Sequence, residues 1–159
     1  MKSMRATGGI LVLLMALTAI GVALAPLGSP ALGGDDSDEF REFMEPRLVA
    51  LYDSASAVNG MVTEKSRNIL ALRAESNRIE ALTDEIDAWL ADNEVPAWAE
   101  PVVRDYRDGS LKVETAISAA YEAIGNFDFS KMASMIPVFD EGTDLLQRAL
   151  GTLRDSASE

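Results

Sequence analysis

The chain has 159 residues, the usual length of a single domain, and it contains neither cysteine nor histidine. Disulfides, thiolate nucleophiles and thiolate metal sites are therefore excluded, as is imidazole in the role of general base or metal ligand. The 26 acidic and 14 basic residues give a formal net charge of −12.

The charges are distributed unevenly along the chain. Lys2 and Arg5 precede a long uncharged segment, and every acidic residue lies at or after Asp35. The part from Asp35 onward holds 12 basic and 26 acidic residues, a net charge of −14. Phosphate backbones repel such a body, so we predict no nucleic-acid partner. Solubility or a salty environment would explain the same composition.

An apolar segment of 21 uncharged residues runs from Gly8 to Gly28. About 20 apolar residues span a bilayer as a helix, and a signal peptide has the same charged start with a shorter apolar core. Ala23–Ala25 has the small-x-small form of a cleavage site, but Pro26 follows it directly. We therefore predict that residues 1–28 are either a signal peptide or an N-terminal membrane anchor.

Both alternatives place the acidic body outside the cytoplasm, because positive residues before an apolar segment stay inside. We predict an extracytoplasmic protein that is anchored to the cell membrane, through residues 8–28 if they are uncleaved, or secreted. Glycine, proline, serine and aspartate dominate residues 29–38, which we assign to a flexible acidic linker. Residues 39–155 are predicted to form a helical bundle, and residues 156–159 a disordered tail.

Apolar residues recur every seven positions from Met44 to Leu90, at the a and d spacing of a helix that packs along one seam. One set is Leu48, Ala55, Val62, Ile69, Ser76, Thr83 and Leu90, and the other is Met44, Leu51, Val58, Lys65, Leu72, Ile79 and Ile86. We expect the first helix to begin near Ser37 or Asp38. Pro46 predicts either a start of the main helix there or a bend.

Asn59-Gly60 leaves two architectures open. Glycine is favoured just past a helix end, so a turn there would be followed by a second helix from Glu64 to Asp92. The heptad phase nevertheless passes through Gly60 without a slip, as it would in one long helix over residues 38–92. We favour the turn. The long helix, covered by two shorter ones, would make a rod more prone to dimerise.

Two more helices follow the connection that contains Trp98. The first runs from Pro101 to about Asn126. Within it, Gly109-Ser110 would either allow close approach of a neighbour or weaken the helix locally by about 1 kcal/mol. The last is predicted to start with Ser130 as its N-cap and to kink or restart at Pro137. No segment alternates with period two. The predicted fold is all-α: an N-terminal transmembrane or signal helix followed by an up-down antiparallel four-helix bundle.

Carboxylates are the abundant reactive groups, but their spacing in the sequence matches no metal-binding or catalytic motif. Di-metal sites in bundles use inward-facing glutamates with histidines, and the predicted seams carry no acidic residue. A nucleophile elbow and a phosphate-binding glycine loop are both missing from the sequence. We therefore predict no catalytic residues, no metal and no cofactor, and a protein that is not an enzyme.

Two sets of residues are candidates for contact with a partner or ligand. Trp89, Trp98 and Tyr106 surround one connection and should gather at one bundle end, as an anchor or pocket, or as a hydrophobic lid. The polar seam residues could line a small cavity or merely bond to their own helix backbone. This second set is Ser76, Thr83 and Ser110. We prefer the lid and the backbone bonds.

The functional prediction follows from the apolar segment, the linker and the absence of catalytic motifs from the sequence. We predict a non-enzymatic bundle that acts through protein–protein interaction at the cell surface, with an unidentified protein partner or a second copy of itself. The alternative is a sensor-like module that binds a small molecule between its helices.

Overall fold

The computed structural model describes residues 35–64, 68–126 and 128–156, and over these it is helical with no strand. The elements are α1 (Asp35–Thr63), α2 (Ile69–Asp92), the 3₁₀ helix η1 (Ala97–Ala99), α3 (Glu100–Gly125), α4 (Phe129–Ser134) and α5 (Ile136–Asp155). The all-α prediction is confirmed. The predicted apolar span at residues 8–28 lies outside the described residues. None of the described helices is both long enough and apolar enough to cross a membrane.

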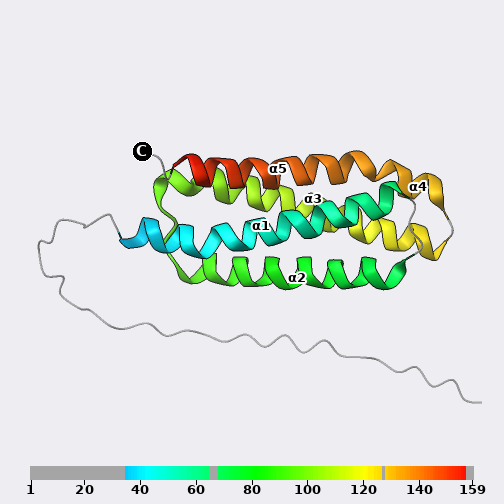
Figure 1. Ribbon diagram of the computed structural model, residues 1–159, viewed down its shortest axis with the longest axis horizontal. Helices are drawn as coiled ribbons and strands as arrows, with labels where there is room; N and C mark the ends of the chain where they lie inside the picture. Colours follow the sequence, from blue (N-terminus) through cyan, green and yellow to red (C-terminus); the bar gives the residue numbers. More distant parts are fainter. Residues whose placement is uncertain (1–34, 65–67, 127, 157–159) are drawn as a thin grey trace, which may run out of the picture. The chain divides into compact units, whose positions relative to one another are not determined.

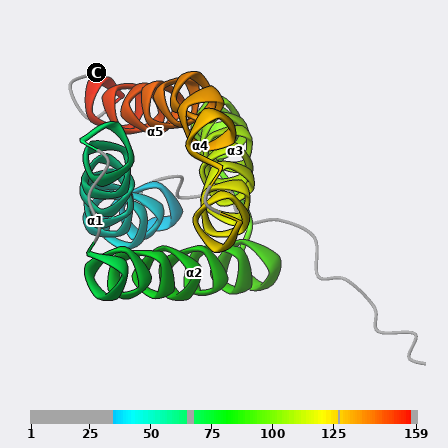
Figure 2. The same cartoon turned by 90° about the vertical axis from the view of Figure 1, so that its right-hand side faces the viewer.

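The four long helices pack as a bundle with alternating directions (Figure 1). Followed by colour, α1 and α3 run one way and α2 and α5 run the other. Viewed towards one end, α1 neighbours α2 and α5, and α3 neighbours α5 and α2 (Figure 2). Short α4 completes the turn between α3 and α5. The predicted up-down arrangement is thus the one found.

Both predicted architectures at Asn59-Gly60 are wrong in detail. Helix α1 continues through Gly60 to Thr63, and α2 begins only at Ile69, so neither a turn at Gly60 nor one helix over 38–92 exists. Gly60 has open space around it and no unusual backbone angle, so it costs the helix only about 1 kcal/mol. Val58 and Val62 stay buried on either side of it. The Asn68 side chain accepts a bond from Ala71 N and caps α2.

Other helix boundaries also differ from the predictions. Helix α1 begins at Asp35, so residues 35–38, assigned to the linker, form its first turn, and the helix runs through Pro46 without interruption. The N-cap of α4 is Asp128 rather than Ser130, because its Oδ1 accepts a hydrogen bond from Lys131 N (2.9 Å). The predicted restart at Pro137 is confirmed, since α4 ends before Met135 and α5 begins at Ile136.

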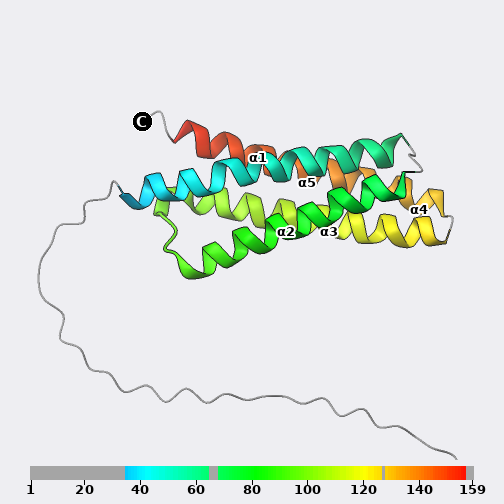
Figure 3. The ribbon, with the colours of Figure 1, turned by 60° about the horizontal axis from the view of Figure 1, so that its bottom comes forward.

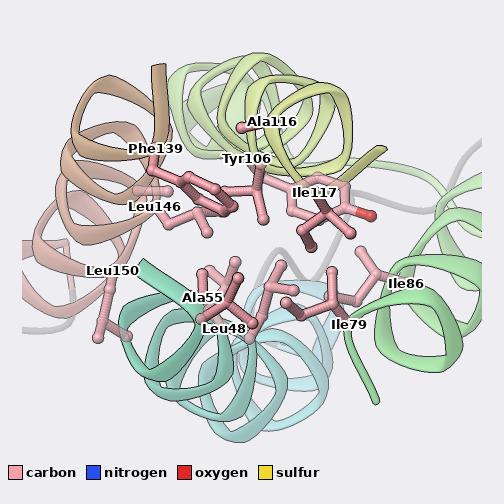
Figure 4. Close-up of a cluster of buried hydrophobic side chains, with 14 of the residues drawn as sticks. Leu48, Ala55, Ile79, Ile86, Tyr106, Ala116, Ile117, Phe139, Leu146 and Leu150 are labelled. Carbon is pink, nitrogen blue, oxygen red and sulfur yellow. The ribbon is translucent and has the colours of Figure 1, made fainter. Parts of the chain in front are cut away.

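All four long helices contribute to one core (Figure 4). Figure 4 shows Leu48 and Ala55 facing Phe139 and Leu146 across the centre, with Ile79 entering from α2. Ile69, predicted to lie on the seam, is instead 51% exposed, because α2 only begins there.

Helices α3 and α5 make the closest contact in the bundle. Gly109 faces Gly142, and a Cβ added at Gly109 would lie 3.0 Å from the Gly142 carbonyl oxygen. A Cβ added at Gly142 would lie 2.9 Å from Val113 Cγ2. The close approach expected at Gly109 is therefore confirmed, and its partner is Gly142 of α5.

Candidate functional site

The seam between α2 and α3 is the weakest of the four joints between neighbouring helices. These two helices contact each other far less than the other three neighbouring pairs do, and α2 lies obliquely to α3 (Figure 3). An ion pair crosses each of the other three joints: Arg47 with Glu85 at 2.5 Å, Arg154 with Glu45 at 2.8 Å, and Lys112 with Glu141 at 3.0 Å. In the described part of the chain, none crosses from α2 to α3.

Two tyrosine hydroxyls link α3 to α2 instead. The Tyr106 hydroxyl donates towards the Thr83 carbonyl (3.2 Å) and Asp87 Oδ1 (3.0 Å). The Tyr121 hydroxyl donates to Ser76 Oγ at 3.2 Å. Burial, and then the charge of Asp87, raise the pKa of Tyr106 far above its usual value. Tyr106 is therefore a neutral donor at physiological pH.

A groove of about 760 Å³ lies where α2 and α3 stand apart. Ile79 and Ile117 form an apolar floor, and both side chains are more than nine-tenths buried. Polar side chains from both helices form the walls. They include Ser76, Asn77, Thr83, Ser118 and Tyr121. A smaller hollow of about 290 Å³ lies further along the same two helices. Glu114 lines both hollows, so they lie next to each other along the α2–α3 seam, and together we call them the α2–α3 groove.

Four carboxylates line this groove: Glu80, Asp84 and Asp87 from α2, and Glu114 from α3. The basic residues that line it are Arg73 and Arg107. None of these six charged groups forms an ion pair with another described residue. The groove is therefore acidic on balance, and of its four carboxylates only Asp87 is engaged by another described residue, as an acceptor for the Tyr106 hydroxyl.

The three polar seam residues all lie at this groove. Ser76 and Thr83 line its larger part and Ser110 its smaller part. Their hydroxyls donate to carbonyls of their own helices: Ser76 to Leu72 O at 2.8 Å, Thr83 to Glu80 O at 3.0 Å, and Ser110 to Arg107 O at 3.2 Å. They give the seam small, polar walls, and their donors are already used.

The predicted aromatic set is only partly brought together. Trp89 and Trp98 both contact Phe40 edge-on, with ring centroids 5.8 and 5.6 Å apart, and Trp89 also stacks on Phe43 at 4.6 Å. Tyr106 is not part of this cluster, because its fully buried ring lies in the core between α3 and α2 (Figure 4). The expected gathering of all three residues is therefore corrected to a pair of tryptophans.

The tryptophan pair closes one end of the bundle against α1. Trp98 Nε1 donates to Ser37 Oγ at 3.2 Å, and the Arg41 guanidinium lies 4.8 Å from the centre of the Trp98 ring. Arg41 also donates to the Ser156 carbonyl oxygen, just past the end of α5. This cluster joins the N-terminal part of α1 to the C-terminal end of α5.

The groove contains residues that we did not single out as candidates. Glu80, Asp84 and Asp87 stand at i, i+4 and i+7, a spacing that the sequence itself displays and that puts them on one helix face. Tyr121 lies beside Ala120, which belongs to the apolar stripe of α3, and not on that stripe itself, so no pattern marked it. In the described residues, no group of three acidic side chains is close enough to hold a metal ion.

Comparisons of the chain with protein-family models, with curated proteins and with solved structures find no match.

Proposed function

We propose that this protein is a non-enzymatic helical bundle that binds another protein at the cell surface through its α2–α3 groove. Residues 8–28 would hold the bundle outside the cytoplasm as a membrane anchor, or would direct its secretion. The positive charges before this apolar segment and the acidic body after it support that placement.

The open α2–α3 seam is the observation that carries the proposal. A bundle that served only as a spacer gains from closing every joint between its helices, as the ion pairs do at the other three joints. The fourth joint instead presents an apolar floor between two polar walls, which is the form of a groove that receives a helix. Exposed Leu111, 64% accessible, extends the apolar surface at one end.

Blocking the groove tests the proposal. Ser118 is exposed on the groove wall, and Ser134 is exposed on α4 away from it. The full chain, solubilised in mild detergent from its native membranes, should bring down a defined partner that Ser118→Trp releases and Ser134→Trp retains. If the wild-type chain elutes alone, or if both variants keep the same partner equally, the groove is not the binding surface.

A small-molecule site is the second candidate, favoured by the volume of the groove. About 760 Å³ lies within the range of about 300–1,000 Å³ that ligand pockets occupy. A ligand that binds the folded state must raise the melting temperature. In this case a metabolite would stabilise the full chain, and Ser118→Trp would cancel the shift while Ser134→Trp would not. No shift across a broad metabolite set would rule this candidate out.

A further inference from the structure

The charges of the α2–α3 groove form an ordered row. Glu80, Asp84 and Asp87 follow one another along α2, and Glu114 of α3 lines the groove beside them. Because α2 and α3 run in opposite directions, Arg73 lies towards one end of the groove and Arg107 towards the other. The charged side chains in the middle of the groove are therefore all acidic.

This acidic row is not compensated within the described bundle. Like charges four residues apart repel on a helix surface, so the pair Glu80 and Asp84 weakens an isolated α2 slightly. By contrast, Glu85, which is also on α2, forms an ion pair with Arg47 of α1. A positively charged occupant would relieve the repulsion in the row.

The size and floor of the groove indicate the form of the occupant. Its lining runs from Ile69 to Ala91 on α2, a length of about 33 Å at 1.5 Å per helical residue. Exposed Ile69 and Leu111 lie towards the ends of the groove and offer apolar surface to an apolar stripe, above the nearly buried floor of Ile79 and Ile117. A second copy of this chain, itself at −12, would meet electrostatic repulsion.

We propose that the α2–α3 groove receives a cationic amphipathic helix of about 20 residues from a partner protein. Its apolar stripe lies over the isoleucine floor, and its lysine or arginine side chains lie along the acidic row. This inference rests on the proposed function and adds the chemistry of the partner: charge complementarity sets which helices bind and how fast they associate.

The probe for this proposal is a synthetic 20-residue helix of leucine and lysine in amphipathic order, compared with its leucine and glutamate counterpart. Fluorescence anisotropy measures binding to the full chain in detergent at 0.15 M salt, where the Debye length is about 8 Å. The test variant, Glu80→Gln/Asp84→Asn/Glu114→Gln, neutralises three of the four carboxylates and leaves Asp87, which accepts from Tyr106, in place. Circular dichroism verifies that it stays helical.

The matched control, Glu42→Gln/Asp53→Asn/Glu94→Gln, removes the same three charges from exposed positions outside the groove. The lysine helix should bind the wild-type chain, and the groove triple should weaken it about tenfold, whereas the control triple changes affinity less than about twofold. Equal losses in both triples, or equal binding of the glutamate helix, overturn the cationic partner.

The groove-blocking variant, Ser118→Trp, distinguishes failure of the cationic-partner inference from failure of the docking surface itself. If Ser118→Trp abolishes peptide binding while the groove triple leaves it unchanged, the groove receives helices by apolar contact and only the cationic inference fails. If neither change affects binding, the proposed docking surface fails as well. A mass that doubles with concentration in the absence of peptide, and that Ser118→Trp restores to one copy, identifies a second copy as the occupant and also overturns the proposal.

Discussion

A methyl group added at Gly142 tests the packing of α3 against α5. The new Cβ would lie 2.9 Å from Val113 Cγ2 and 3.1 Å from the Gly109 carbonyl oxygen, closer than side-chain carbons pack. Alanine gains about 1 kcal/mol over glycine in a helix interior, and over-packing a tight contact costs about 1–3 kcal/mol. We therefore expect Gly142→Ala to be neutral or to destabilise the bundle by up to about 2 kcal/mol.

Gly151 on the same helix is the matched control, because a Cβ there meets nothing within 4 Å. Gly151→Ala should stabilise the bundle by up to about 1 kcal/mol. The propensity gain cancels between the two variants, so their difference isolates the packing cost, about 1–3 kcal/mol or about 4–12 °C in Tm. Urea and thermal unfolding followed by circular dichroism measure it. Equal stabilisation by both substitutions would refute the close α3–α5 contact.

Three further predictions concern buried side chains. Ser54 is buried and its hydroxyl has no partner among the described residues, so Ser54→Ala should raise the free energy of unfolding by about 1 kcal/mol; a fall would show that the hydroxyl is bonded. Phe40→Ala should cost about 3–5 kcal/mol and shift tryptophan emission to longer wavelength, because Phe40 is fully buried between Trp89 and Trp98. Because the folded state raises the pKa of Tyr106, its contribution to stability is complete below about pH 10 and declines as the unfolded chain ionises above that pH. Tyr106→Phe should therefore flatten the fall of Tm between pH 9 and 11, and an unchanged slope would contradict the buried, neutral phenol.

The order and number of the four long helices could be predicted from the sequence because they depend on local patterns. The heptad set from Leu48 to Leu90 marks residues that are mostly buried, and its unbroken phase correctly indicated that the first helix continues through Gly60, although not that it ends at Thr63. Glycine preference at helix ends misled us, because an exposed helical glycine costs only about 1 kcal/mol and buried Val62 outweighs it. Tertiary burial thus decided the boundary.

The candidate site could be predicted only in fragments. Ser76, Thr83 and Ser110 were recognisable as polar residues on apolar seams, and the structure places all three at one groove. Which pair of neighbouring helices stands apart depends on how tightly the other three pairs pack. The Gly109–Gly142 contact draws α3 towards α5, and no single-helix pattern shows that this leaves α2 joined to α3 mainly through two tyrosines. The sequence pattern likewise predicts Tyr106 at a bundle end. Only the packed fold shows that its ring is buried opposite α2.

Hydrogen exchange of the full chain, with and without the leucine–lysine helix, tests most directly the claim that the α2–α3 seam is the docking surface. Amides of α2 from Leu72 to Ala91 and of α3 from Arg107 to Tyr121 should become more protected when the peptide binds, because the groove closes over it. The α1–α5 joint, closed by Arg154 and Glu45, should exchange at the same rate in both states. Protection confined to α1 and α5 would contradict the account.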